Sequence, residues 1–501
     1  MYQVTKSFSD GLELLCKTRK EEILSAKDEL IIKGTTYYVS NDGSDENDGL
    51  SPKNPWKTLE KVSSAEFEPG DGVLFKRGDL FRGYVQTKSG VTYGAYGIGD
   101  KPKFYGWHQN IAGNDLWELY DEKHNIWKLK ESILDCGTLV FNEGELHSRK
   151  LIPSYIGGKF VCRDDESRDF DMAKEMTLDL DIVCFYDKRL TTKPTKGRDF
   201  PIPVMDDQSL GELYLRCDKG DPSKVFSSIE ALPRRHMFKV GHNFDVKIDN
   251  LCLKYIGTHA ISAGGECVKG LHVTNCEIGW VGGCIQHYYG TDPNYPEGGR
   301  GTVTRFGNGV EIYGGCDDYL VENCYIYQVY DAGITHQVST FGKTYKMNNV
   351  RYKRNLVEYC VYSIEYFLEK TEENNESIIK DCEMSDNILR SSGYGWGQQR
   401  HNTHTPAHIK GWSYENTAKD FVIKNNVFDR SAYRMLHLVA KKEESLPKMF
   451  GNVYIQHLGA TLGQYGANES AEPENLVFDE FADEKIASVF KDIEARVYLI
   501  E

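Results

Sequence analysis

Apolar and polar residues between positions 240 and 455 follow a weak repeat. Each copy places an Asn or Asp inside a short apolar segment, and a second strand-like segment follows it. Such segments cannot bury their apolar side chains alone, so they stack on one another and like residues align in columns. Four copies are clear, at residues 273–278, 321–326, 379–384 and 423–428.

The Asn or Asp of each copy is spaced as in the coils of a parallel β-helix. These residues lie at positions 250, 275, 323, 355, 381 and 425, with spacings of 25, 48, 32, 26 and 44 residues. The short spacings match one coil, and the long ones match a coil with an insertion. Asn tolerates the left-handed conformation of a tight turn and hydrogen-bonds the nearby backbone. We therefore predict a right-handed parallel β-helix, the handedness following from the general preference for right-handed crossovers.

The flanking segments complete an all-β fold with short helical segments at both ends. Helix-spaced apolar residues predict an N-terminal helical cap over residues 1–35, which we expect to shield an edge. The β-helix is expected to begin at 36–108 and to be interrupted by an inserted β-rich, sandwich-like domain at 109–238. The main β-helix, with the catalytic face, is expected at 239–455. A C-terminal tail with an amphipathic helix follows at 456–501.

The second strand of each coil defines an outward-facing column. Its Ile or Val points into the core, so the next residue points out by the period-two alternation of a strand. The column reads Ser262, Gln286, Thr335, Glu365 and His437, with Glu311 near it.

Three carboxylates are expected to converge on this face. Glu311 and Glu365 fall about two coils apart, so their backbones lie roughly 10 Å apart at ~4.8 Å per strand. Asp331 begins the coil between them. Glycoside hydrolysis uses two carboxylates that flank the scissile bond, ~5.5 Å apart for retention or ~6.5–9.5 Å for inversion. One of them must stay protonated, which a neighbouring like charge favours. The alternative interpretation is an ordinary solvated acidic face.

Two long loops carry residues suited to sugar binding. Residues 288–307 and 391–412 are rich in aromatic, Gln, Arg and His residues. Aromatic rings stack on sugar faces, and polar side chains bind hydroxyls. The expected substrate-binding residues are Gln286, His336, Gln337, Tyr366, Trp396, Arg400 and His401.

Composition excludes several other classes of protein. The 501 residues carry a net charge of −15 without a basic stripe, which disfavours nucleic-acid binding. No run approaches the ~18 apolar residues of a membrane span. The N-terminus lacks the order of a signal peptide, so a cytoplasmic location is expected. The thirteen cysteines lie at least eight residues apart, which indicates buried free thiols rather than zinc knuckles or a disulfide framework.

Metal and cofactor chemistry is not expected. The loop at 41–49 superficially resembles a calcium loop but lacks the bidentate Glu and the flanking helices. His401 and His404 form an i, i+3 pair that is better suited to substrate hydrogen bonds than to a metal. The expected partner is an oligosaccharide substrate. The flat sides of a β-helix also allow homo-oligomers.

Three stretches of the sequence resemble a known group of proteins. The segment from Tyr37 to Leu59, with Asn41-Asp-Gly-Ser-Asp45 and Asp48-Gly-Leu-Ser-Pro52, resembles the start of bacterial β-helix proteins of the pectate-lyase-like superfamily. Residues 309–315 and 327–333 resemble its carbohydrate-active members. A β-helix interrupted by a β-sandwich is similar to the architecture of the family 120 β-xylosidases. The sequence pattern also resembles that of the family 141 hydrolases.

This resemblance implies an exo-acting, β-xylosidase-like glycoside hydrolase. It implies that Asp331 is the nucleophile, Glu365 the acid/base and Glu311 a supporting carboxylate, with Glu358 as a competitor for the acid/base role. A polysaccharide lyase on the same fold is an alternative, with Arg400 or Arg354 as the base. An epimerase, a transglycosylase and a non-catalytic glycan-binding β-helix are further alternatives.

Overall fold

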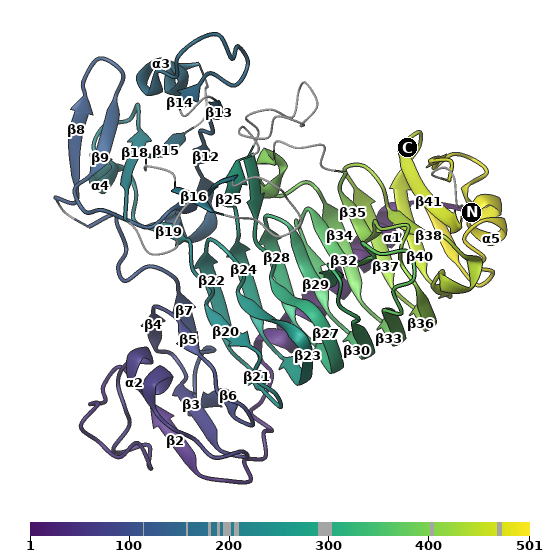
Figure 1. Cartoon of the computed structure of the whole chain (residues 1–501), viewed down its shortest axis with the longest axis horizontal. Helices are drawn as coiled ribbons and strands as arrows, with labels where there is room; N and C mark the ends of the chain where they lie inside the picture. The colour runs from purple at the N-terminus through teal and green to yellow at the C-terminus, as the bar shows by residue number, and fades with distance from the viewer. Residues whose placement is uncertain are drawn as a thin grey trace.

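The protein folds into a parallel β-helix with a β-rich insertion beside its N-terminal coils (Figure 1). The computed structural model describes residues 1–500, apart from 114, 157–158, 179–181, 188–190, 194–201, 205–209, 289–302, 401–404 and 468–472. Strands from successive coils pair in parallel along the long axis of the molecule. The fold predicted from the repeat is therefore confirmed.

One side of the β-helix is an eleven-stranded sheet in which each coil contributes one short strand. Its strands pair in parallel from one end of the molecule to the other. In spatial order they are β1 (Tyr2–Gln3), β43 (Arg496–Ile500), β40 (Val453–His457), β37 (Val427–Ser431), β34 (Ile388–Ser392), β31 (Leu356–Glu358), β28 (Tyr325–Val329), β24 (Glu277–Val281), β22 (Cys252–Ile256), β7 (Lys103–Tyr105) and β4 (Leu80–Arg82).

A second side holds the outward column predicted from the sequence, and we call it the site face. Its strands are β5 (Val85–Gln86), β20 (Phe238–Gly241), the first parts of β23 (Ile261–Thr274) and β27 (Val310–Glu322), β29 (Ala332–Ser339), β32 (Tyr362–Glu369), β35 (Ala407–Gly411), β38 (Leu436–Ala440) and β41 (Thr461–Ala467). The short β42 (Leu476–Val477) pairs antiparallel with β41.

The third side is joined to the site face because β23 and β27 are long and run through both. It consists of β2 (Thr36–Val39), β3 (Gly72–Lys76), β6 (Thr92–Tyr96), β21 (Lys247–Asp249), the later parts of β23 and β27, β30 (Lys346–Lys353), β33 (Ile378–Ser385), β36 (Ala418–Lys424) and β39 (Lys448–Phe450).

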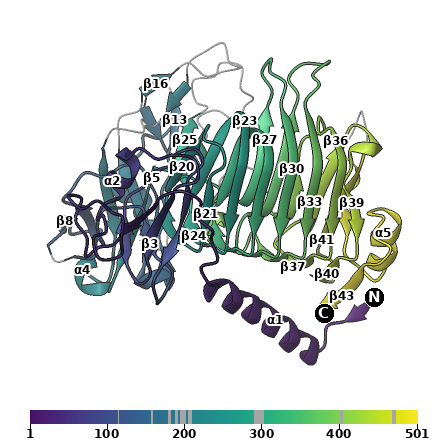
Figure 2. The same ribbon diagram turned by 90° about the horizontal axis from the view of Figure 1, so that it is seen from below.

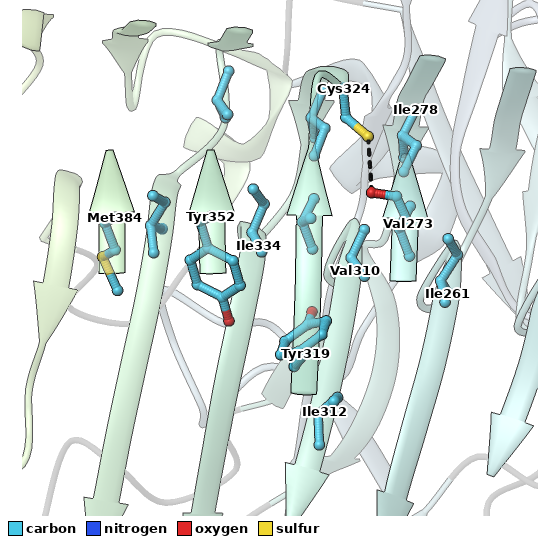
Figure 3. Packing of buried hydrophobic residues seen from close by; sticks show 14 of the residues in the cluster. Ile261, Val273, Ile278, Val310, Ile312, Tyr319, Cys324, Ile334, Tyr352 and Met384 are labelled. Atoms are coloured by element: carbon cyan, nitrogen blue, oxygen red, sulfur yellow. Dashed lines mark hydrogen bonds between the residues drawn. The ribbon is translucent and has the colours of Figure 1, made fainter. Parts of the chain in front are cut away.

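Apolar side chains from all three sides fill the interior between them. Ile261 and Ile334 come from the site face, Tyr319 and Tyr352 from the third side, and all are buried (Figure 3). Cys324 lies at the turn between sides and its thiol donates to the carbonyl of Val273 at 3.6 Å. All thirteen cysteines are free thiols and only Cys267 is exposed, as the sequence predicted.

The predicted Asn turns form two columns rather than one. Four of the predicted positions, 250, 275, 323 and 425, adopt left-handed backbone at the same turn, and Arg354, Asp386 and Gly451 complete that column. Asp381 instead belongs to a left-handed column at another turn, with Asp318, Asn349 and Asp420. The repeat therefore marked two different corners of the coil.

Asn355, the remaining predicted position, lies one residue further on and points into the core. It begins a ladder of four fully buried residues, Asn355, Asn387, Asn426 and Asn452. From Asn355 to Asn426, each Nδ2 donates both to a backbone carbonyl and to the Oδ1 of the next rung, and both distances are 2.9 Å for Asn387. The last rung donates to Asp492 Oδ2 at 2.8 Å. The ladder satisfies backbone groups that the turn would otherwise bury unpaired.

Replacement of Asn387 by Ala is expected to lower the free energy of unfolding by about 3 kcal/mol, because it leaves several buried hydrogen-bonding groups unpaired. The groups that lose this partner are the backbone N–H of Asn355, one N–H of its Nδ2 and the carbonyl of Tyr352. Urea denaturation measures the effect. The control is Asp386→Gly, which should be nearly neutral because glycine readily adopts the φ of 57° found there. Equal losses in both variants would contradict the role of the ladder.

The N-terminal helix does not cap an end of the β-helix, contrary to the expectation. Helix α1 (Lys6–Leu24) lies along the outer side of the eleven-stranded sheet (Figure 2), where Leu12, Cys16 and Ile23 contact apolar residues of that sheet. The strand before it, β1, pairs with β43 and so closes the C-terminal edge of the sheet.

Two other short helices contribute to the core near the ends of the β-helix. Helix α2 (Leu59–Ser64) buries Leu59 and Val62 in the core at the N-terminal end. Helix α5 (Ala482–Ser488), within the predicted C-terminal helix, buries Ala482 and Ile486 there at the other end. No helix in the described ranges combines the length and apolar character needed to cross a bilayer.

The chain between β7 and β20 forms small sheets with their own apolar core. One sheet pairs β8 (Trp117–Asp121), β9 (Ile126–Leu129), β18 (Glu212–Arg216), β15 (Val183–Asp187) and β12 (Arg149–Lys150). A second pairs β11 (Leu146–His147), β10 (Cys136–Phe141) and β19 (Ile229–Pro233). A hairpin pairs β13 (Ser154–Ile156) and β14 (Lys159–Val161). The helices here are α3 (Met172–Thr177) and α4 (Pro222–Val225).

A four-stranded sheet connects this insertion to the β-helix. It pairs β16 (Thr191–Lys193), β17 (Ile202–Val204), β25 (Cys284–Tyr288) and β26 (Val303–Phe306). Arg305 of β26 strengthens the junction, since its guanidinium donates to the carbonyl of Gly283 at 2.7 Å and to that of Gly137 at 2.9 Å. The insertion is thereby held next to the site face.

Candidate active site

The strand register places five of the six predicted polar residues, all except Gln286, in one outward column. Ser262 pairs with Glu311, Glu311 with Thr335, and Thr335 with Glu365. The column continues through Lys410 and His437. Lys410 was not predicted, although it follows Ile409 as Glu365 follows Ile364. The same alternation of apolar and polar residues would have identified it.

Glu311 and Glu365 lie two strands apart on this face, with Thr335 between them. At ~4.8 Å per strand their backbones are roughly 10 Å apart, as the sequence predicted. Both side chains are largely buried, with residue exposures of 6% each. Asp331, immediately before β29, is 9% exposed. The charges of Asp331 and Glu311 both act on Glu365, so the three carboxylates form one electrostatic group.

Side-chain donors hold Glu311 on both carboxylate oxygens. Its Oε1 lies 3.3 Å from Nε2 of His259, and its Oε2 accepts from Gln337 Nε2 at 3.0 Å and from Asn308 Nδ2. Burial raises the pKa of Glu311 to about 7, and the charge of Asp331 adds to this effect. The hydrogen bonds from Asn308 and Gln337 act in the opposite direction. Because three donors point at it, the Glu311 carboxyl group is held in one orientation.

The protonation of His259 follows from its hydrogen bonds. Its Nδ1 accepts the backbone N–H of Asn308 at 2.9 Å, so the ring proton must sit on Nε2, where it faces Glu311. Burial lowers the pKa of His259 to about 4, which keeps the ring neutral near pH 7. His236 stacks on it with ring centroids 5.1 Å apart. His259 is therefore a neutral donor that positions Glu311.

Replacement of His259 by Gln is expected to lower turnover by up to about 10²-fold, because a small displacement of a reacting group costs that much. The KM is expected to change much less. Steady-state kinetics on a cleaved glycoside measure both values. The control is His272→Gln, since His272 also contacts a carboxylate, Asp318 at 2.9 Å, but lies in the part of β23 that belongs to the third side. Comparable losses in the two variants would contradict the positioning role.

Asp331 and Arg400 form an ion pair at the edge of the site. The guanidinium also lies over the ring of Tyr362, with its carbon 5.6 Å from the ring centroid. The guanidinium thus contacts both the Asp331 carboxylate and an aromatic face. The segment that carries Arg400 is fixed by the insertion, because Gln399 accepts from the amide of Lys150 at 3.1 Å and donates to the carbonyl of Ser148 at 2.9 Å.

Glu365 has a different environment from that of Asp331. The ammonium of Lys410 lies 3.8 Å from its carboxylate and 4.0 Å from the ring centroid of Tyr362. Burial raises the pKa of Glu365 to about 7. The positive charges of Lys410 and Arg400 lower this pKa, whereas the negative charges of Asp331 and Glu311 raise it. A carboxyl group in this range is able to give and take a proton near neutral pH.

Three of the predicted substrate-binding residues are buried away from the site face, and a fourth leaves its column. His336 points into the core and bonds the hydroxyl of Tyr352 at 2.7 Å, and Tyr366 packs against Phe421 in the same core. Trp396 is buried beneath the insertion and donates to the carbonyl of Gln328 at 2.8 Å. Gln286 lies on β25, which turns away to pair with β26.

The remaining predicted binding residues have different outcomes. Gln337 and Arg400 lie in the site, each hydrogen-bonded to a carboxylate. His401, like His404, lies outside the described residues. An aromatic pair that was not predicted as a binding site, Phe367 and Trp412, lies next to Glu365, with ring centroids 4.6 Å apart. The outward alternation of β32 places Phe367 two residues after Glu365 and would have indicated it.

Glu358, the competing candidate for the acid/base, lies on the eleven-stranded sheet instead. It is 3.5 Å from Arg390, close to α1, and therefore does not join the other carboxylates. Arg354, a candidate lyase base, also lies on the α1 side, 3.4 Å from Glu22.

The carboxylates of the loop at 41–49 have partners within the protein. Asp45 accepts from the amides of Lys57 and Thr58 at 2.9 and 3.0 Å, and Asp42 pairs with Lys76 at 2.7 Å. Across the described part of the chain, no three His, Cys, Asp or Glu residues gather as a metal site requires.

No protein-family model matches the chain. The lacto-N-biosidase of Bifidobacterium longum subsp. longum is 33% identical over 121 residues, which are 22% of this chain and 7% of that protein. The alignment thus spans only a small part of the relative's length. The complex of XylC with xylose is 14% identical, covers 93% of this chain and 82% of that chain, and gives a TM-score of 0.33. The native GH136 lacto-N-biosidase from Eubacterium ramulus is 12% identical, covers 98% and 71% of the two chains, and gives a TM-score of 0.36. These proteins are what the chain is similar to, and its own strand pairing establishes the β-helix.

Proposed function

We propose that this chain is a glycoside hydrolase that acts on short oligosaccharides. The observation that carries the proposal is the group of Glu311, Asp331 and Glu365, buried together on the site face with contrasting partners. Glycosidic cleavage requires one carboxyl group that donates a proton and a second that acts as a carboxylate, and the different partners of Glu365 and Asp331 support such a division. The partial sequence similarity to a lacto-N-biosidase supports the same class of reaction.

The environments also support a division of roles. Glu365, with its pKa raised to about 7, protonates the leaving oxygen and later activates water. Asp331, paired with Arg400, attacks the anomeric carbon as the nucleophile. Glu311, fixed by its donors, supports the transition-state charge from the neighbouring strand. With these roles the anomeric configuration is retained, because two inversions follow one another.

The proposed specificity is exo-acting and β-xylosidase-like. It rests on the resemblance of the sequence to the family 120 β-xylosidases. A screen of nitrophenyl glycosides tests it, starting with the β-xyloside and continuing with the α-fucoside and the β-galactoside. Release of nitrophenol from the β-xyloside at the highest kcat/KM is the expected result. A higher value for another glycoside would contradict the xylosidase assignment and leave the reaction class intact.

A lyase reaction would appear as a different product. Lyases need a basic residue beside a uronate and leave an unsaturated sugar that absorbs in the near ultraviolet. Lys410 is the cation on the site face that fits such a base, since Arg400 is paired with Asp331. Growth of that absorbance with uronate polymers, without nitrophenol release from any glycoside, would overturn the hydrolase proposal.

A further inference from the structure

The outward column of the site face changes its charge after Glu365. On one side it carries Glu311 and Glu365, whereas the next two strands present Lys410 and His437. Arg434, in the turn before β38, lies close enough for its charge to act on His437, as does the charge of Lys410. We call Lys410, Arg434 and His437 the basic group. It starts one strand from Glu365, a step of ~4.8 Å.

Arg434 brings an uncompensated charge to this group. Its backbone N–H donates to the carbonyl of Pro406 at 3.0 Å, which fixes the turn, and its guanidinium lies over the ring of Tyr433 at 5.2 Å. Within the described ranges it makes no ion pair, and its buried Nε has no hydrogen-bond acceptor. A half-buried guanidinium without an acceptor is costly, and a bound oxyanion would remove that cost.

His437 adds an unsatisfied polar side chain beside Arg434. It is only 6% exposed, and neither ring nitrogen has a partner among the described residues. Its neighbours Leu436 and Leu438 point into the core, so the ring stands on the outer side of β38. Burial, with the charges of Arg434 and Lys410, lowers its pKa to about 3, and the neutral ring keeps one N–H donor.

Within the described ranges, one carboxylate forms an ion pair with the basic group. Glu365 faces it directly, 3.8 Å from Lys410. Glu415, the next acidic residue along the chain after β35, is already paired with Lys441. The group is therefore a local cationic region in a chain whose net charge is −15. Such a region favours a localised anion rather than a long polyanion, which the overall charge would repel.

We propose that Lys410, Arg434 and His437 form a subsite for an anionic substituent, a carboxylate or a sulfate, on the sugar beside the scissile bond. One sugar ring is about as long as one strand spacing, so an anion held here leaves the neighbouring glycosidic oxygen near Glu365. The proposal names the substrate class of the proposed hydrolase and rests on it for the position of the bond. The recognition of the anion follows from the basic group itself.

Calorimetric binding of monosaccharides tests this subsite without any turnover. The probes are D-glucuronate, D-galacturonate and D-glucose 6-sulfate, each compared with neutral D-glucose or D-galactose. Wild type is expected to bind at least one anionic sugar ten-fold or more tightly than its neutral counterpart. The uronates and the sulfate ester distinguish the two kinds of anion. The difference in affinity should shrink as salt is raised.

Two variants and a control locate the binding. Arg434→Gln and Lys410→Gln are each expected to remove most of the preference for the anionic sugar. Arg351→Gln is the matched control, because Arg351 lies on the outer side of β30, away from the site face. No preference in wild type, or a preference that survives in Arg434→Gln, would overturn the proposal. Binding of anionic sugars without hydrolysis of any glycoside would instead contradict only the proposed function.

Discussion

Replacement of Asp331 by Asn is expected to lower kcat/KM for the best nitrophenyl glycoside by ~10³-fold or more. An amide cannot form the glycosyl intermediate, and the variant loses the charge that stabilises the developing positive charge on the sugar. The substitution is isosteric, and Asp331 lies at the end of a turn rather than inside a strand. The fold should therefore persist, which circular dichroism and the urea midpoint check.

The control for this variant is Glu322→Gln. Glu322 is a partly buried carboxylate on β27, the strand that also carries Glu311, but it lies on the third side of the β-helix. Its activity should equal that of wild type. If Asp331→Asn kept its activity, Asp331 would have no part in the chemistry, and Glu311 would take its place as the candidate nucleophile.

Replacement of Glu365 by Gln is expected to have an effect that depends on the leaving group. A general acid contributes about 10²–10⁴-fold where the leaving oxygen needs a proton. Hydrolysis of a disaccharide or a methyl glycoside should therefore fall by ~10³-fold or more. Hydrolysis of a nitrophenyl glycoside, whose leaving group needs little protonation, should fall much less. Equal losses on both kinds of substrate would contradict the assignment of Glu365 as the acid.

The pH dependence of activity should reflect the titration of Glu365. Below about pH 7 Glu365 holds its proton, so the activity of wild type on a disaccharide should fall as the pH rises through this value. Because Glu311 titrates in the same range, the observed pKa belongs to the interacting carboxylates together. Glu365→Gln should lack this fall in its residual activity.

Stability provides an independent check on the pKa of Glu365. Its pKa is higher in the folded protein, about 7, than the ordinary 4.5, so the folded state holds more protons between these values. The stability that Glu365 contributes is thus present below pH 4.5 and is lost as the pH rises to 7. Glu365→Gln is neutral at every pH, so its stability relative to wild type should increase over that range.

The fold could be predicted from the sequence because stacking leaves a strong pattern. The repeated segments around Cys276, Cys324 and Cys382 fixed the coils, and alternation after each Ile fixed Thr335 and Glu365 on the outer face. The sequence did not reveal that the repeated Asn and Asp residues belong to two different corners of the coil, because these residues suit both left-handed corners equally well. The position of α1 along the sheet could also not be predicted, because the apolar residues of an amphipathic helix do not specify which surface it packs against.

The site could be predicted only in part, and the errors have two causes. His336 and Tyr366 alternate with outward residues and so point into the core, yet their polar atoms suggested substrate contact. Trp396 and Gln286 lie in excursions from the coil, where strand alternation no longer says which way a side chain faces. The contacts of His259 and Asn308 with Glu311 could not be predicted, because they depend on how separate coils are aligned in three dimensions.

The most direct test of the carboxylate mechanism is a proton NMR time course of wild type with its preferred nitrophenyl glycoside. It shows the anomeric configuration of the sugar at the moment of release, before mutarotation. We expect a free sugar with the same configuration as the substrate, because Asp331 and Glu365 act in two inverting steps. First release of the opposite anomer would contradict the nucleophile assignment. A vinyl proton in the product, or no product from any glycoside tested, would contradict the hydrolase itself.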